Sequence, residues 1–356
     1  MKTIYLLTGA AGLLGNNVAL SLISESKQVR ALVLDGDPAA EHIPKEAEVV
    51  IGDVTDIPSL ERFFTVTKGT EVIVIHCASI VSVSPLPSQK VYDVNVTGTQ
   101  NIVDLCVANK VKKLVYISSS GAIPELPSDQ TIYEPESFDT EVVVGYYSKT
   151  KALATQIVLK AVKENGLDAS IIYPSGICGP NDYAFGPVAG VIMQYCDGKI
   201  PVGFEGSFNS VDVRDLAEGV VACAEKGRRG EGYIMSNEMV TICRLFDLIS
   251  TTSGSPVVDT ILSADDMIAM SAKNIPEGPE KEEKLATLKF SMYNMVRNNN
   301  FSSEKAQKEL GYHTRPFEET ITDEVNWLIS IGKVKKQSVY SGKPMTNGQL
   351  QAIERR

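Results

Sequence analysis

Three glycines near the N-terminus constrain this chain more than any other feature. They follow an apolar run rich in β-forming residues, keep the spacing G-x-x-G-x-x-G between residues 9 and 15, and precede a segment with helical periodicity. We call this stretch the glycine turn. Glycine permits a tight turn and close approach to a ligand, and the helix that follows points its free N–H groups and positive dipole end at a pyrophosphate. A dinucleotide is therefore the expected ligand. The expected contacts are Gly9, Gly12, Leu13, Leu14 and Gly15.

The composition is that of a soluble globular protein. Of 356 residues, 43% are hydrophobic and 22% charged, enough for one large domain or for two that share an interface. The net charge of −10 argues against nucleic acid as a partner, since binding its phosphates needs clustered Lys and Arg. The sequence contains no run apolar enough to span a bilayer and no secretory signal, so we expect a cytoplasmic protein with no membrane partner.

The cysteines and histidines do not indicate a metal site or disulfides. The six cysteines are scattered through apolar runs without a C-x-x-C pair, which favours buried free thiols. The three histidines are far apart in the sequence, so we expect no metal. The cysteines are Cys77, Cys106, Cys178, Cys196, Cys223 and Cys243.

From the glycine turn to Pro174, short apolar strands alternate with amphipathic helices, which predicts an α/β fold with a doubly wound parallel sheet. The later chain is rich in Gly and Pro and less regular. We therefore divide it into a dinucleotide-binding domain (1–173), a smaller α/β substrate-binding region (174–332) and a loosely ordered polar tail (333–356). The expected strands are 29–34, 48–51, 71–76, 113–118 and 168–173; the expected helices are 57–64, 88–109 and 145–164. Residues 123–139 lack any period and are expected to form a mobile surface loop beside a site.

Two carboxylates after the second and third strands bear on cofactor choice. A carboxylate at the end of the second strand can bind the ribose 2′-OH of NAD, whereas an arginine there accepts the 2′-phosphate of NADP. Asp35 lies there and no basic residue follows before Lys45, which favours NAD over NADP, although Asp35 is equally suited to a turn. Asp53 is suited either to the adenine amino group or to capping the next helix, for which Asp56 is the better candidate.

A tyrosine and a lysine spaced by four residues form the strongest catalytic signal. Tyr147 and Lys151 share one face of a predicted helix, one turn apart. A free tyrosine has a pKa of about 10, and a nearby ammonium together with an oxidised nicotinamide would stabilise its phenolate. Ser120, at a strand end, is placed to hydrogen-bond a substrate oxygen. Asn95, unusual within its predicted helix, is a candidate to hold a water or a backbone group that supplies protons to Lys151.

Four other residues have mainly structural interpretations. Tyr146 competes with Tyr147 but has no lysine four residues later, so we assign it to substrate lining or packing. His76, at a strand end, is expected to be a hydrogen-bonded structural histidine. Arg214 and Asp215 are expected to form a pair that stabilises the fold.

Six short motifs occur in order along the chain: T-G-A-A-G-L-L-G at 8–15, G-D-V at 52–54, H-C-A-S at 76–79, N-V-T-G-T at 95–99, S-S-S at 118–120 and Y-S-K-T-K at 147–151. Together they resemble the extended short-chain dehydrogenases/reductases of the NAD-dependent epimerase/dehydratase superfamily. The resemblance continues to about residue 330 and is strongest to the branch of 3β-hydroxysteroid dehydrogenases and dihydroflavonol reductases.

The resemblance implies a Rossmann-type fold that binds NAD or NADP, and often a homodimer paired through the helices near 88–109 and 147–164. One departure is Tyr173-Pro174, where many members have Arg-Pro, so the following loop is expected to be arranged differently. The implied catalytic residues are Ser120, the third serine of its triplet, Tyr147, Lys151 and Asn95. The cofactor contacts implied or considered beyond the glycine turn are Asp35, Asp53, Val54, Ala78, Ser79, Tyr147, Lys151, Pro174, Ser175 and Ile177.

Three functions fit these residues. The first is an NAD(P)-dependent oxidoreductase that interconverts a secondary alcohol and a ketone on a bulky, mainly apolar small molecule, similar to a hydroxysteroid or a dihydroflavonol. The second is a nucleotide-sugar epimerase or dehydratase, disfavoured because Arg297 and Arg315 are isolated and form no cluster for a diphosphate. The third is a non-catalytic protein that senses the cofactor, disfavoured because Ser120, Tyr147 and Lys151 are all present.

Overall fold

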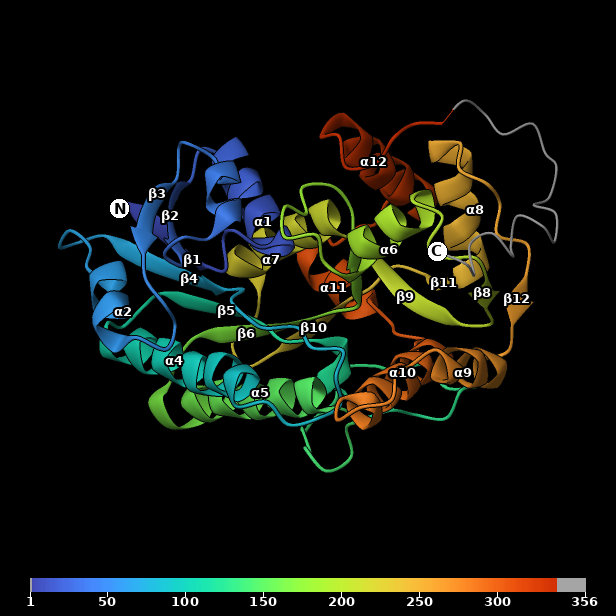
Figure 1. The fold of residues 1–356 in the computed structure, drawn as a ribbon. Coiled ribbons are helices and arrows are strands. Elements are labelled where there is room, and N and C mark those ends of the chain that lie inside the picture. Colours follow the sequence, from blue (N-terminus) through green and yellow to red (C-terminus); the bar gives the residue numbers. More distant parts are fainter. Residues whose placement is uncertain (1, 338–356) are drawn as a thin grey trace.

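The computed structural model describes residues 2–337, and its centre is a seven-stranded sheet in which every pairing is parallel (Figure 1). Across the sheet the strands are β3 (Glu48–Ile51), β2 (Gln28–Val33), β1 (Thr3–Thr8), β4 (Glu71–His76), β5 (Lys113–Ile117), β6 (Ala169–Pro174) and β10 (Gly232–Met235). The strand order reverses its direction between β1 and β4. The predicted doubly wound α/β fold is therefore confirmed, and ligands of such sheets bind at the carboxyl ends of the strands near this reversal.

Helices cover both faces of the sheet, which explains why its strands are apolar along most of their length. One face packs against α1 (Leu13–Ser24), α7 (Val213–Lys226), α11 (Glu304–Leu310) and the short 3₁₀ helix η1 (Pro38–His42). The other packs against α2 (Ile57–Phe64), α4 (Gly98–Ala108) and α5 (Tyr146–Asn165). Figure 1 shows α4 and α5 on one side of the sheet and α1 and α7 on the other.

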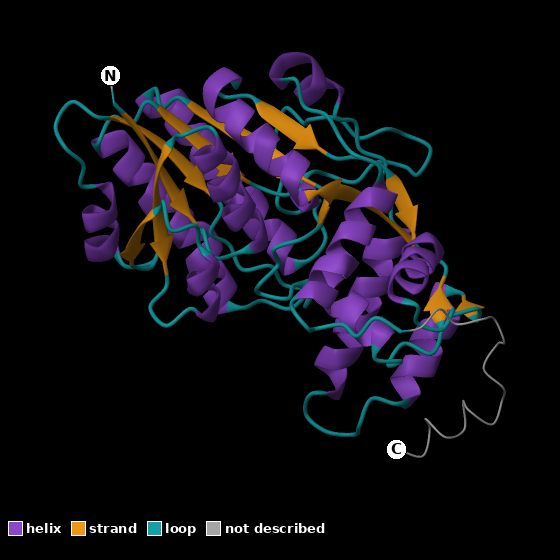
Figure 2. Cartoon of the chain, turned by 90° about the horizontal axis from the view of Figure 1, so that it is seen from above, coloured by secondary structure: helices purple, strands orange, loops and turns teal. Residues whose placement is uncertain are grey.

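A smaller region with its own apolar core lies beyond the sheet, at the opposite end of the molecule in Figure 2. Its helices are α6 (Pro187–Cys196), α8 (Ile242–Ser253) and α12 (Phe317–Ser330). Its strands are β7 (Gly176–Cys178), β9 (Ser207–Asp212) and β11 (Met239–Thr241) in one sheet, and β8 (Gly203–Phe204) and β12 (Ile261–Leu262) in another. The division at residue 173 stays a prediction. The structure adds that β10 and α7, from beyond that residue, complete the large sheet and its cover.

Two segments differ from expectation. The predicted helix 88–109 is divided into α3 (Gln89–Tyr92), a π-helical turn (Asp93–Thr97) and α4. The later chain, expected to be less regular, contains the long helix α10 (Lys281–Val296), which packs against α9 (Ala264–Lys273). Of the polar tail, residues 338–356 lie outside the described part of the chain.

The segment 123–139 is irregular, as predicted, and hydrogen bonds connect it to distant parts of the chain; its mobility stays a prediction. The Asn298 side chain donates to the carbonyls of Leu126, Pro127 and Gln130 at 2.8 to 3.2 Å. The Glu134 carboxylate accepts from the Ile234 N–H at 2.8 Å. These contacts tie the loop to β10 and to the chain that follows α10.

All six cysteines are free thiols, as predicted; Cys106, Cys178 and Cys223 are buried and the other three are half-buried. Between residues 2 and 337 the structure has no helix that combines the length and the apolar character needed to cross a membrane.

Candidate functional site

The glycine turn is held by very close backbone contacts. Gly9 has a φ of +69°, and a Cβ atom there would lie 2.7 Å from the Ala78 nitrogen. A Cβ on Gly15 would lie 2.1 Å from the Gly9 carbonyl oxygen. Packing therefore requires glycine at both positions. Among the described residues, a Cβ on Gly12 would meet only that same oxygen, at 3.4 Å, so Gly12 faces open space of the kind that a bound phosphate needs.

The helix after this turn offers an anion site. Gly12 caps α1 without a side-chain hydrogen bond, and the first helical turn contains no acidic residue. The N–H groups of Leu13, Leu14 and Gly15 thus keep the hydrogen-bonding capacity that every uncapped helix start has. This geometry fits a pyrophosphate.

The carboxylates near the expected adenosine position have different surroundings. Asp35 is exposed in the turn after β2, where both of its predicted roles remain possible. Asp53 accepts hydrogen bonds from the N–H and the hydroxyl of Thr55, each at 2.8 Å, which shapes the loop after β3. Asp56 caps α2 by accepting from the Ser59 N–H at 3.2 Å, so the expected cap is confirmed.

Lys151 is a buried residue of α5, the helix that also contains Tyr147. The Lys151 ammonium donates to the Ile117 carbonyl at 2.7 Å and lies 5.1 Å from the centre of the Tyr116 ring. Burial lowers the pKa of Lys151 to about 7. The ammonium is therefore held by one strand-end carbonyl and one aromatic face.

Two serine hydroxyls affect the pKa of Tyr147, which lies one turn before Lys151. Burial raises the pKa of Tyr147 above its ordinary value, and the hydroxyls of Ser119 and Ser79 oppose that rise. Ser119 also accepts from the Gly121 N–H at 3.0 Å. Ser120 begins the short 3₁₀ helix η3 (Ser120–Ala122) and is not one of the two hydroxyls that act on Tyr147.

Asn95 lies in the π-helical turn and is buried. Its side-chain oxygen accepts from the Ser79 hydroxyl at 3.1 Å and from the Ile80 N–H at 2.8 Å. Its amide donates to the Ile80 carbonyl at 3.0 Å and to the Thr150 hydroxyl at 3.1 Å. All four hydrogen-bonding positions of the amide are used. Asn95 thus holds a backbone segment, one of the two alternatives expected for it, and does not contact Lys151.

Gly98, a glycine at the start of α4, has a packing role. A Cβ on Gly98 would lie 2.6 Å from a methyl group of Val54, which is buried in the loop after β3. This contact brings α4 close to the expected adenosine end of the site.

The opposite end of the site contains an unpartnered polar atom. Pro174 ends β6, Ser175 follows it, and Ile177 lies in β7. The Ser175 hydroxyl oxygen is buried and has no hydrogen-bond partner among the described residues. A buried hydroxyl without a partner is costly unless a ligand satisfies it. With the open start of α1, this residue makes the carboxyl edge of the sheet fit a dinucleotide.

The sequence did not predict the effect of Ser119 and Ser79 on the pKa of Tyr147, because three adjacent serines give no signal for which hydroxyl lies near the helix. Sequence reasoning also misjudged the partners of two charged residues. Arg214 pairs with Asp212 and Asp323, at 2.7 and 2.6 Å, and not with Asp215. Asp215 binds Arg315 at 2.7 Å. Both residues do stabilise the fold, as expected, but by joining α7 to α12 and to the loop before it.

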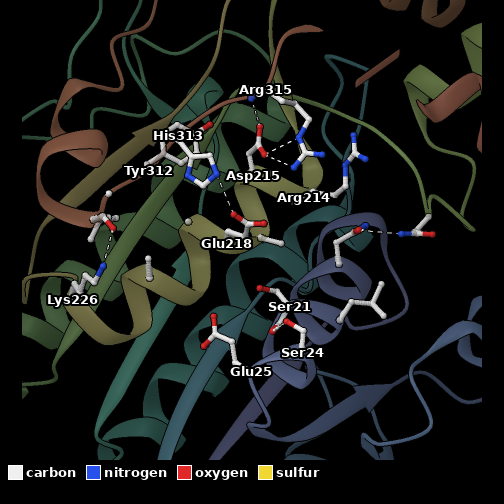
Figure 3. Close-up of a pocket in the computed structure, with 18 residues that line it drawn as sticks. Ser21, Ser24, Glu25, Arg214, Asp215, Glu218, Lys226, Tyr312, His313 and Arg315 are labelled. Carbon is white, nitrogen blue, oxygen red and sulfur yellow. Dashed lines mark hydrogen bonds and ion pairs between the residues drawn. The ribbon is translucent and has the colours of Figure 1, made fainter. Parts of the chain in front are cut away.

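A surface cavity of about 590 Å³ lies apart from this site, between α1, α7 and residues 310–315 (Figure 3). Neither Tyr147 nor Lys151 lines it. Two of its basic side chains are paired with carboxylates, His313 with Glu218 at 3.4 Å and Arg315 with Asp215. The cavity is therefore separate from the site around Tyr147 and Lys151.

The fold and the site define an enzyme class: a doubly wound sheet with a glycine turn for a dinucleotide and a Tyr-Lys pair at the carboxyl ends of the strands. The model of the "NAD dependent epimerase/dehydratase family" matches residues 5–237. The chain belongs to this family, within the extended short-chain dehydrogenases/reductases, and it is an enzyme.

Individual proteins agree with this assignment. The chain is 27% identical over 345 residues to a "putative dihydroflavonol 4-reductase" of Synechocystis, covering 95% of this chain and 98% of the relative. It is 29% identical over 256 residues to "sterol demethylase protein B" of Methylococcus capsulatus, covering 70% and 75% of the two chains. The crystal structure of gox2253 matches with a TM-score of 0.78 at 29% identity, covering 94% of this chain and 99% of that one.

Proposed function

We propose that this enzyme interconverts a secondary alcohol and a ketone by hydride transfer with NAD or NADP. The observation that carries the proposal is the placement of Tyr147 and Lys151 on one face of α5, beside Ser79 and Ser119, the serines after β4 and β5 whose hydroxyls oppose the rise of the Tyr147 pKa. These groups lie at the carboxyl ends of β4 and β5, where a doubly wound sheet binds its ligands.

Each residue has a distinct task in this mechanism. When bound, the nicotinamide would supply or accept the hydride. Tyr147 gives a proton to the carbonyl oxygen during reduction and takes it back during oxidation. The positive charge of Lys151 favours the phenolate. The sequence predicts, and the resemblance implies, that Ser120 hydrogen-bonds the substrate oxygen; we assign this hydrogen bond to Ser119 instead, because the Ser119 hydroxyl opposes the rise of the Tyr147 pKa.

The substrate we propose is bulky and mainly apolar. Val81 and Val83, which follow the segment held by Asn95, are 62% and 54% exposed. Val142 and Val144, which precede α5, are 52% and 43% exposed. Apolar side chains left uncovered on both sides of a site indicate an apolar ligand. The names of the two curated relatives, a dihydroflavonol reductase and a sterol demethylase protein, support a sterol-like or flavonoid-like molecule.

The test is absorbance at the reduced-nicotinamide band while the enzyme meets hydroxysteroids, flavonoids and simple alcohols with NAD or NADP. Tyr147→Phe is expected to abolish turnover while leaving cofactor affinity largely unchanged, and Tyr146→Phe is the matched control. Lys151→Ala should weaken both turnover and cofactor binding. Wild-type-like activity in Tyr147→Phe would refute the mechanism.

We also propose that NAD is preferred over NADP, because Asp35 follows β2 and the next basic residue is Lys45. Fluorescence titration with NADH and NADPH measures the preference directly. Asp35→Ala should reduce the difference between the NADH and NADPH affinities, and the neighbouring Asp37→Ala should leave this difference unchanged. Equal affinities in the wild type would remove the proposal.

A nucleotide-sugar epimerase is less well supported. The guanidinium of Arg315 is engaged by Asp215 at 2.7 Å and so is not free for a diphosphate. A cofactor that stays bound through purification, with no turnover across the panel, would favour this alternative.

A further inference from the structure

A row of buried polar side chains connects β1 and β4 to α4. Thr8 and His76 are register partners on β1 and β4, and Thr99 reaches the same histidine from α4. Each of these three side chains is at most 1% exposed. The Thr8 hydroxyl lies 2.7 Å from Nδ1 of His76, and the Thr99 hydroxyl lies 3.1 Å from Nε2. Both ring nitrogens of a buried histidine are therefore engaged.

Counting donors fixes the direction of every hydrogen bond in this row. The Thr99 hydroxyl donates its one proton to the Asn95 carbonyl at 2.7 Å, so it must accept from Nε2–H of His76. In a neutral ring Nδ1 is then unprotonated and accepts from the Thr8 hydroxyl, which itself accepts from the Ala78 N–H at 3.2 Å. Burial, assisted by the charge of Lys151, lowers the pKa of His76 to about 3, so the ring stays neutral.

The row ends at Asn95, whose side chain binds Ser79 near Tyr147. The Asn95 carbonyl lies in the π-helical turn, where the regular helical pattern is interrupted, and the Thr99 hydroxyl binds it there. The side chain of Asn95 holds the hydroxyl of Ser79, one of the two that oppose the rise of the Tyr147 pKa. An unbroken chain of hydrogen bonds thus runs from the strand before the glycine turn to the surroundings of the catalytic phenol.

We infer that His76 is a positioning residue. Through Thr99 it fixes Asn95, and through Asn95 it fixes the Ser79 hydroxyl beside Tyr147. Its other ring nitrogen holds Thr8 at the end of β1, next to the glycine turn. The hydrogen-bonded row does not depend on the proposed function, whereas its effect on turnover rests on it.

The first experiment is nitrogen-15 NMR of the imidazoles in the full-length protein. The chain has three histidines, so His76→Asn assigns the signal. We expect a neutral ring protonated at Nε2 whose shifts stay constant from pH 8 to pH 5. Protonation at Nδ1, or titration within this range, would overturn the inference.

The second experiment measures turnover in variants of Thr99, the α4 residue that hydrogen-bonds His76. Thr99→Val removes the link and should lower kcat by about tenfold through misplacement of the catalytic groups. KM and cofactor affinity should change less than twofold, and Thr99→Ser should restore most of the rate. Thr97→Val, at an exposed threonine of the same segment, is the matched control.

These outcomes distinguish failure of the positioning role of His76 from failure of the proposed function. Unchanged kcat in a folded Thr99→Val enzyme overturns the positioning role, as does failure of Thr99→Ser to restore the rate. If the wild type turns over no compound of the panel, the proposed function fails, and the tautomer of His76 still decides whether the row exists.

Discussion

Ser119 and Ser120 are neighbours at the end of β5, but their hydroxyls have different surroundings. Ser119 acts on Tyr147, whereas Ser120 begins a 3₁₀ turn. We therefore expect Ser119→Ala to lower kcat by about a hundredfold, the usual loss for one hydrogen-bond donor to a developing oxyanion. Ser120→Ala should stay within a few-fold of the wild type. Initial rates under saturating cofactor distinguish them, and the reverse order would return the role to Ser120.

Lys151 has a stability cost as well as a catalytic task. Its pKa falls from an ordinary 10.5 to about 7, so between these values the unfolded chain binds one more proton than the folded one. Wild-type stability should therefore rise with pH through this window. From pH 7.5 to pH 9 the free energy of unfolding of the wild type should rise by about 2 kcal/mol relative to that of Lys151→Met, which lacks the titrating group. Urea titrations at the two pH values measure it; a constant difference would contradict the shift.

On α12, a buried glutamate carries the opposite pH dependence. Glu324 accepts from the Gly179 N–H at 2.7 Å, and burial, with Asp182 and Asp212 nearby, raises its pKa to about 8. Its contribution to stability is complete below its ordinary pKa of 4.5 and is lost as pH rises toward 8.

Glu324→Gln keeps an oxygen for the Gly179 N–H and removes the titration. The variant should gain stability over the wild type between pH 5 and pH 8, by at most about 1.4 kcal/mol per pH unit. Thermal melts across this range test it, with the exposed Glu318→Gln on the same helix as control. A gain that does not grow with pH would contradict the assignment.

In the segment 88–109, sequence periodicity predicted the helix but not the π-helical turn that interrupts it. Its apolar spacing predicted a helix, and Asn95 was singled out as unusual within it. The π-helical turn itself was not predictable, because its cause lies elsewhere: the Asn95 side chain is held by a loop after β4, and Gly98 is required by Val54.

Across the whole molecule, the two regions share one sheet. β10 adds the seventh strand beside β6, and α7 buries apolar side chains such as Leu216 and Val220 against the same face as α1. A chain of residues 1–173 would leave that face exposed. We expect it to lack a cooperative thermal transition by circular dichroism, in contrast to the full chain. A sharp transition would show that the first region folds alone.

The sequence by itself determined the fold class, the glycine turn and the Tyr147/Lys151 pair, because these depend on short-range spacing: strand and helix periods, a turn that only glycine fits, and one helical turn between two side chains. Tertiary structure alone decided which serines affect the pKa of Tyr147, what Asn95 holds and which strands complete the sheet. Those properties depend on contacts between segments far apart in the chain, such as Asn95 with Ile80 and β10 with β6. No local pattern records such contacts, since each partner is an ordinary residue until the fold brings the two together.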